Sequence, residues 1–276
     1  MLLVKPDSAS HWYLPDRTPF HSVPRADGEG QRSTTLRDAR KVGAYPSVTN
    51  VLGVLAKPAL DAWKQEQAIL AALTLPRREG ESEDDFAKRV VEDMGAQVNK
   101  AADLGSAVHR ACEVYAQTHE LPEHPGVARL FAPVQEWFDT MVEAVRLVER
   151  VVVHHALGFG GTVDLVAKLR LTGTWSVVDF KTQRLKRDTK GQSKPNFYDT
   201  WALQLEAYRQ GLLAEADGPA PQDIVSVVIS SDEPAPVAVK VWPRELLPNC
   251  WRAFQCAHHL WTWNKGYQPV TAPYLA

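Results

Sequence analysis

Two aspartates and one lysine stand out in a valine-rich stretch, GTVDLVAKLRLTGTWSVVDFKT. Asp179 and Lys181 are two residues apart, so on a β-strand their side chains leave the same face of the sheet. A turn at Gly173 predicts an antiparallel hairpin that brings Asp164 beside this pair. Two carboxylates can hold Mg²⁺ or Mn²⁺ against a phosphate oxygen while the ammonium stabilises developing charge. The pattern therefore predicts phosphodiester hydrolysis, and the alternative is a structural ion pair at a strand end.

Two helical segments carry further polar pairs. In DLGSAVHRACEVY, His109 and Glu113 are spaced i and i+4 on one helix face, where either can serve a metal ion. In WALQLEAYRQGL, Gln204 and Tyr208 have the same spacing and offer an amide and a phenol to a phosphate, a water or Lys181. Either pair alone is also common on an ordinary surface or boundary helix. Their combination with the acidic hairpin favours a functional site.

The ordered set GSAVH, GTVDLV, VVDFKT and QLEAY resembles the PD-(D/E)XK nuclease superfamily, specifically its RecB-like and phage-type exonuclease branch. The resemblance covers roughly residues 99–212, and the earlier segment YPSVTNVL is similar as well. It implies an α/β fold with a restriction-endonuclease-like core, in which helices flank a mixed β-sheet, plus an N-terminal helical region. It also implies a metal-dependent DNA exonuclease of recombination, repair or phage DNA metabolism.

The resemblance assigns the metal ligands one by one. His109 matches the metal-binding histidine, and Asp164 and Asp179 match the two metal-binding acids. The backbone carbonyl of Phe180 is implied as a further ligand, and Glu113 is an additional candidate. The expected cofactor is Mg²⁺ or Mn²⁺.

The same resemblance implies the roles of the remaining catalytic residues. Lys181 matches the catalytic lysine, and Gln204 and Tyr208 match a motif that helps position this lysine and the nucleic acid. Some relatives add four cysteines that hold an iron-sulfur cluster. This chain has three cysteines without a matching arrangement or a CxxC pair, so we expect buried thiols and no cluster.

A basic loop follows the acidic hairpin and suits contacts with DNA phosphates. Its cations are Arg184, Lys186, Arg187, Lys190 and Lys194. Tyr198 and Trp201 follow the loop and can stack on bases, although a solvated loop with aromatic side chains turned into the core is equally compatible with the sequence. By the family architecture, the preceding helices, including Trp63, wall the cleft and thread a strand end, which favours an exonuclease. The expected partner is DNA that is single-stranded or has free ends, with a recombinase or a single-strand binding protein as further candidates.

Periodicity predicts the elements that must position these residues. Helices are expected over residues 59–72, 85–94, 99–119, 127–149, 198–214 and 244–264, with another beginning at Ser47 or Thr49. Strands are expected near residues 11–14 and in VERVVVHHAL, GFGGTVDLVAKLRL, TWSVVDFKT, DIVSVVIS and PVAVKVW. The strands VERVVVHHAL, GFGGTVDLVAKLRL and TWSVVDFKT are expected to form an antiparallel meander. Gly105 offers a close-packing position on the helix expected over residues 99–119. We expect a polar arm over residues 1–43, a helical wall over 44–98 and a nuclease core over 99–276 that forms one compact unit with the wall.

Composition excludes several classes of protein. The 276 residues are 45% hydrophobic and 23% charged, which is typical of a soluble globular chain rather than a disordered one. No window approaches the roughly 18 apolar residues of a membrane span, and no signal peptide is evident, so a cytoplasmic protein of a bacterium or a phage-infected cell is expected. The net charge of −2 gives no global basic surface, so any nucleic-acid binding must be local.

Three alternatives to the exonuclease remain at this point. A structure-specific DNA endonuclease would use the same residues. A catalytically silent DNA-binding or assembly protein would be expected to lose the acids or the lysine, and this chain keeps them all. A hydrolase of nucleotides or phosphomonoesters could use the same acids but would not need the basic, aromatic loop.

Overall fold

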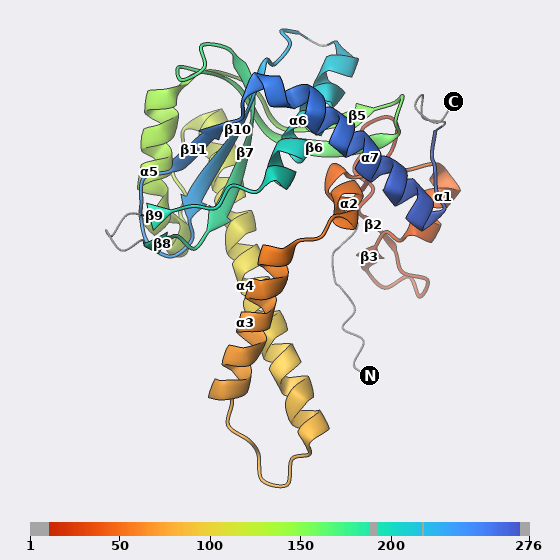
Figure 1. Ribbon diagram of the computed structural model, residues 1–276, viewed down its shortest axis with the longest axis vertical. Coiled ribbons are helices and arrows are strands. Elements are labelled where there is room, and N and C mark those ends of the chain that lie inside the picture. The colour runs from red at the N-terminus through yellow and green to blue at the C-terminus, as the bar shows by residue number, and fades with distance from the viewer. Residues whose placement is uncertain (1–10, 188–192, 217, 271–276) are drawn as a thin grey trace.

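A five-stranded mixed β-sheet lies at the centre of the computed structural model, which describes residues 11–187, 193–216 and 218–270 (Figure 1). The strands are β5 (Val142–His154), β6 (Phe159–Leu169), β7 (Trp175–Gln183), β10 (Asp223–Ser230) and β11 (Ala238–Val241), in the spatial order β11-β10-β7-β6-β5. The first three form the predicted antiparallel meander. Strand β10 runs parallel to β7 and antiparallel to β11. The predicted mixed sheet is therefore confirmed.

Helices cover both faces of this sheet. Helices α6 (Asp199–Glu215) and α7 (Leu247–Lys265) pack over one face, as the predicted ranges indicate. Helices α4 (Glu83–Thr118) and α5 (Pro125–Met141) build a second core on the other. Strand alternation divides β7 between these cores, because Val177 faces the first and Val178 and Phe180 face the second. Asp179 and Lys181 consequently share the face that α6 covers.

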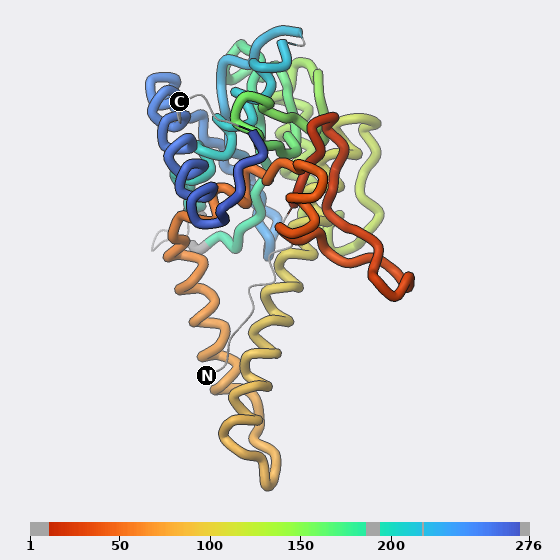
Figure 2. The backbone as a smooth tube through the Cα atoms, turned by 90° about the vertical axis from the view of Figure 1, so that its right-hand side faces the viewer, coloured from red at the N-terminus to blue at the C-terminus, as the bar shows by residue number. Residues whose placement is uncertain are grey.

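Residues 83–118 form one long helix, α4, rather than the two helices expected there. The sequence predicts separate helices over 85–94 and 99–119, but α4 runs unbroken through 36 residues. The intervening residues include no proline, and Gly95 alone does not stop a helix. The domain boundary expected at residue 99 falls inside α4. Figures 1 and 2 show α3 (Pro58–Thr74) and the first part of α4 projecting from the body as a helical hairpin.

The helix predicted over residues 127–149 is wrong in its last third. Helix α5 ends at Met141, and the chain continues directly as β5, in which Val142 pairs with Leu169 and Val145 pairs with Ala167 of β6. The apolar residues of this segment fit a helical period and an irregular strand equally well. Cross-strand pairing decides between the two conformations, and this is a tertiary interaction that local periodicity does not report.

The N-terminal segment packs into the body from residue 12 onward. Strand β1 (Trp12–Tyr13) pairs with β4 (Tyr45–Pro46), which confirms the strand expected near residues 11–14. Trp12 is 2% exposed and contacts Trp261 and Tyr267 near the end of α7, so the segment expected to be a polar arm contributes to the core. Helix α2 (Val48–Val51) begins at Ser47, whose side chain accepts a hydrogen bond from the Asn50 N–H, as predicted.

The remaining elements are short. They are β2 (Ser22–Pro24), β3 (Gln31–Ser33), α1 (Leu36–Val42), η1 (Leu52–Val54), β8 (Lys186–Arg187), β9 (Ser193–Lys194) and η2 (Arg244–Leu246). Strands β8 and β9 form a small hairpin where the sequence predicts only a loop. Among the cysteines, Cys112 is buried as expected, but Cys250 is half-buried and Cys256 is exposed. Within the described ranges, no helix combines the length and the apolar character needed to cross a bilayer.

Three glycines let neighbouring elements approach the sheet. A Cβ on Gly161 would overlap the ring of Tyr208 from α6, and one on Gly160 would lie 2.9 Å from Tyr13. A Cβ on Gly105 of α4 would lie 3.2 Å from the Thr182 hydroxyl on β7, which agrees with the close packing expected there. Side chains at these positions would push α6, the N-terminal segment or α4 away from the strands.

We predict that Gly161→Ala lowers the free energy of unfolding by about 1–3 kcal/mol, because the added methyl group must displace the buried Tyr208 ring. The matched control is Gly95→Ala on α4, where a Cβ meets no atom within 4 Å and should stabilise the helix by roughly 0.5–1 kcal/mol. Urea denaturation monitored by circular dichroism measures both. Equal stability of Gly161→Ala and the wild type would contradict the close approach of α6 to β6.

Candidate active site

Asp164 and Asp179 lie side by side on β6 and β7. Leu165 of β6 pairs with Val178 of β7 in antiparallel register, so Asp164, which precedes Leu165, lies opposite Asp179, which follows Val178. The Phe180 N–H donates a hydrogen bond of 2.9 Å to Asp164 Oδ2. Asp179 is 2% exposed. The hairpin predicted from the sequence therefore brings together the buried carboxylate of Asp179 and the half-buried carboxylate of Asp164.

Asp179 is the centre of a hydrogen-bonded chain that reaches α6. Lys181 Nζ lies 2.7 Å from Asp179 Oδ1, and Gln204 Nε2 donates to the same oxygen at 3.1 Å. Gln204 Nε2 also lies 3.2 Å from the hydroxyl oxygen of the buried Tyr208. The spacing of i and i+4 thus points both α6 side chains at the strands. The Gln204 amide therefore orients the Asp179 carboxylate, and this carboxylate in turn holds the Lys181 ammonium in place.

His109 enters the same pocket from α4. Its Nδ1 lies 3.4 Å from Asp164 Oδ2, and its ring also makes a hydrogen bond with the Phe180 backbone. Burial, followed by the positive charge of Lys181, lowers the pKa of His109 below its usual value. A neutral imidazole is the form that binds metal ions. The Phe180 side chain points to the opposite core, where it packs against Trp137 and Phe138.

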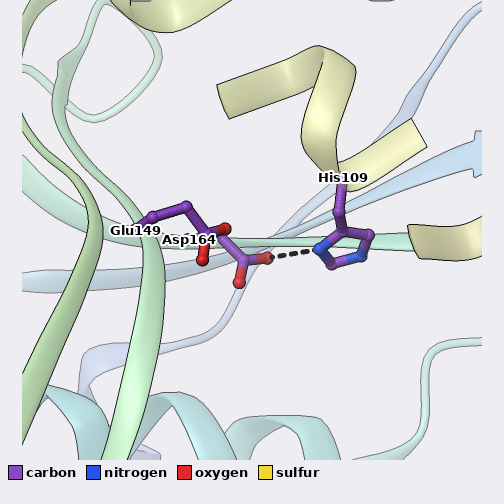
Figure 3. Close-up of side chains that lie close together, drawn as sticks. All are labelled: His109, Glu149 and Asp164. Carbon is purple, nitrogen blue, oxygen red and sulfur yellow. Dashed lines mark ion pairs between the residues drawn. The ribbon is translucent and has the colours of Figure 1, made fainter. Parts of the chain in front are cut away.

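Glu149 is a site residue that the sequence analysis missed. Figure 3 shows His109, Glu149 and Asp164 pointing toward one another, and one ligand atom from each lies within 4.8 Å of the others. Glu149 has a positive φ of 48°, which is unusual for a residue with a side chain, and it lies on β5 between Val148, which pairs with Leu165, and Arg150, which pairs with Val163. The signal for Glu149 in the sequence is a single acid in the valine-rich run VERVVV. The helix expected over residues 127–149 ends on this residue and so does not place it on a strand beside Asp164.

The electrostatics of this group favour a bound cation. Burial, followed by the negative charges of Asp164 and Glu113, raises the pKa of Glu149 to about 7. Burial and the neighbouring Asp179 likewise raise the pKa of Asp164. Four carboxylates therefore line the pocket, together with the ammonium of Lys181 and the guanidinium of Arg110, which is paired with Glu113. A divalent cation would relieve this repulsion, and the oxygen and imidazole ligands fit Mg²⁺ or Mn²⁺.

Glu113 lies in the pocket but has a different neighbour. Its carboxylate pairs with Arg110 at 2.5 Å on the same helix. The group of atoms close enough to share one ion comprises His109, Glu149 and Asp164. The structure therefore points to Glu149 rather than Glu113 as the ligand next to His109.

A long groove joins the pocket that holds the candidate metal ligands. The pocket has a volume of about 550 Å³ and is lined by His109, Glu113, Glu149, Asp164, Asp179, Lys181, Gln204 and Tyr208, among others. The groove measures about 2200 Å³ and runs between α3, α4, the start of α6 and the loop after β10. Thr49 and Gln204 line both spaces, so the groove and the pocket meet there.

The predicted DNA-contact residues are distributed unevenly around the groove. Tyr198 and Trp201 line it together with Trp63 of α3, and Lys181 Nζ lies 5.9 Å from the centre of the Trp201 ring. Arg184 lines it as well, with an 85% exposed side chain that lies 3.5 Å from Asp232. Lys194 is exposed on β9. Lys186 and Arg187 form β8, and Lys190 lies outside the described residues.

Comparison with protein-family models and with curated proteins finds no match for this chain. The side chains that meet in the pocket therefore carry the functional inference. They come from β5, β6, β7, α4 and α6 and converge near the middle of the three strands.

We predict that Glu149→Gln weakens Mn²⁺ binding about tenfold or more, because it removes a charged ligand from the group around His109. Glu113→Gln is the matched control and should weaken binding less, since this carboxylate is paired with Arg110. Isothermal titration calorimetry measures both affinities. A larger loss in Glu113→Gln than in Glu149→Gln would show that the ligand had been assigned to the wrong glutamate.

The raised pKa of Glu149 also predicts a pH dependence of stability without metal. A carboxyl group with a pKa of about 7 in the folded state and 4.5 in the unfolded state binds more protons when folded, so stability falls as pH rises between these values. Glu149→Gln should flatten this fall in EDTA, whereas the exposed Glu123→Gln should not. Urea denaturation at pH 5 and at about pH 8 tests it. An unchanged slope in Glu149→Gln would contradict the burial of an uncompensated carboxylate.

Proposed function

We propose that this chain is a Mg²⁺- or Mn²⁺-dependent DNA exonuclease of the PD-(D/E)XK type, acting in recombination, repair or phage DNA metabolism. The observation that carries the proposal is the convergence of Asp164, Asp179, Lys181 and His109 in one pocket beside a long groove. A mixed sheet flanked by helices is also the architecture that the four ordered motifs imply. Fold, motif order and side-chain geometry therefore support the same chemistry.

Each pocket residue has a task in such a hydrolysis. Asp164, Asp179, Glu149 and His109 would hold the cation, with the Phe180 carbonyl as a further ligand. The bound cation would lower the pKa of a coordinated water and polarise the scissile phosphate. Lys181 is close enough to Asp179 to orient the attacking water or to donate to a phosphate oxygen as negative charge develops. Gln204 and Tyr208 keep Asp179 in the orientation that both tasks need.

The size and lining of the groove support a polymeric substrate. Sites for small molecules typically measure about 300–1,000 Å³, and the groove is about 2200 Å³. Trp63, Tyr198 and Trp201 offer aromatic faces to unpaired bases, and Arg184 and Lys100 offer cations to phosphates. A nucleotide or phosphomonoester hydrolase would not need this extended surface. The helices α3 and α4 wall the groove, which supports action on a strand that has a free end.

We predict that Lys181→Ala lowers the rate of DNA cleavage by about 100- to 1,000-fold while DNA binding persists, because the ammonium acts on the developing charge and lies outside the groove. The assay compares linear single-stranded, linear double-stranded and covalently closed circular DNA with Mg²⁺, Mn²⁺ or EDTA. Metal-dependent loss of linear DNA alone is the expected result. Lys240→Ala removes a lysine that stacks on Trp242 away from the pocket and should retain activity.

Three results would contradict the proposal. Full activity of a pure Lys181→Ala preparation would remove the lysine from the mechanism. Absence of cleavage of every DNA form by the wild type with either metal would favour a binding or assembly protein. Cleavage of closed circles would reassign the chain as an endonuclease.

A further inference from the structure

Two histidines from the N-terminal segment form part of the catalytic pocket wall. The rings of His11 and His21 stack with centroids 4.5 Å apart and an interplanar angle of 24°. Both line the pocket that holds Asp164, together with Tyr13 of β1. Neither belongs to the four motifs that identify the proposed metal centre. The pair therefore has no task in the hydrolysis described above.

The backbone holds this pair in a fixed place. The His11 carbonyl accepts hydrogen bonds of 3.0 Å from both the Ser47 N–H and the Asn50 side-chain amide at the start of α2. The Phe20 N–H donates to the Trp12 carbonyl at 2.7 Å, which keeps His21 beside β1. Such preorganisation reduces the entropy lost when a ligand binds.

The pair lies close to the metal ligands. The Tyr13 hydroxyl is 3.0 Å from the Thr162 hydroxyl. Thr162 precedes Asp164 by two residues on β6, so the two share a face about 7 Å apart along the strand. Among the described residues, His11 and His21 line the pocket and not the groove. A strand that enters from the groove can meet the pair only with the part that has reached the metal centre.

One face of each histidine ring is covered by the other ring. His11 and His21 stack on one another, and Tyr13 contacts His21 edge-on with centroids 5.0 Å apart. Stacking of a base is therefore less suited to this wall than hydrogen bonding. The Trp12 N–H donates to His21 Nδ1 at 3.3 Å, which leaves Nε2 as the N–H donor of the neutral ring. Burial lowers the pKa of both histidines, and His11 lowers that of His21 further, which favours the neutral form of each ring.

We propose that His11 and His21 bind the terminal phosphate of a nucleic-acid strand whose end occupies the catalytic pocket. The inference rests on the proposed nuclease function and names the part of the substrate that this wall selects. N–H donors and the nearby Tyr13 and Thr162 hydroxyls suit phosphate oxygens. Asp164 and Glu149 would repel a phosphate in the absence of metal, so binding requires the carboxylates to be neutralised by cations.

The test measures binding without cleavage. In the Lys181→Ala background with Ca²⁺, fluorescence anisotropy compares oligothymidylates that carry a 5′-phosphate, a 3′-phosphate or neither. One phosphorylated end should bind about tenfold more tightly than the unphosphorylated strand, as expected for hydrogen bonds to a charged group. Adding His11→Ala and His21→Ala should reduce this preference to none. The matched control, His259→Ala, changes an exposed histidine on α7 and should preserve it.

The outcomes separate this inference from the proposed function. A phosphate preference that survives in the double variant, or that is absent from the Lys181→Ala parent, overturns the role of the pair even if the wild type cleaves DNA. Loss of cleavage in the wild type would instead overturn the nuclease. His21 also accepts the Trp12 N–H, so the double variant could lose its fold. His11→Ala alone then decides, because the fixed contacts of His11 with α2 are made by its carbonyl, and it should lower the preference severalfold.

Discussion

The buried carboxylate of Asp179 sets the conditions for the rest of the structure. A charged group that is 2% exposed is unfavourable unless partners replace its lost hydration. Lys181, on the same strand, and Gln204, on the helix α6 that covers this face of the sheet, are these partners. Since Asp164 and Glu149 add negative charge without cationic side chains of their own, the pocket remains incompletely compensated. The fold compensates the charge of Asp179 in part with its own side chains and leaves the remaining negative charge of the pocket to an external cation.

The apolar layers around the pocket keep this arrangement in register. Phe180, between Asp179 and Lys181, packs among Trp137 and Phe138 on the opposite face of the sheet. A slip of β7 by one residue would bury the charged pair in that core and expose Phe180, so hydrophobic burial fixes which side chains face α6. Gly161 then allows Tyr208 to lie directly on β6. The geometry of the pocket and the packing of the core are consequently two results of the same strand alternation.

Local sequence patterns were sufficient for the parts of the site that depend on short-range geometry. The spacing of two in Asp179 and Lys181 and of four in Gln204 and Tyr208 translates directly into shared faces of a strand and a helix. Glu149 was not predictable in this way, because its position depends on pairing between β5 and β6 and on an irregular backbone. Helix α1 was missed although Thr35 and Asp38 form a capping box that its sequence displays. The burial of Trp12 against Trp261 joins opposite ends of the chain, and no local period reports such a contact.

The continuity of α4 has a mechanical consequence. His109 and the projecting hairpin belong to one helix, which extends about 39 Å from Glu83 to His109 at 1.5 Å per residue. A straight helix of this length would pivot as a rigid rod about the point where Gly105 contacts β7. Glu83 lies about 33 Å from that point along the helix, so a rotation of one degree about it displaces the far end by roughly 0.6 Å. The imidazole of His109 lies only one turn from the pivot, so the same rotation moves it more than fivefold less than the far end. A movement of the hairpin would therefore change the position of His109 relative to Glu149 and Asp164 only slightly.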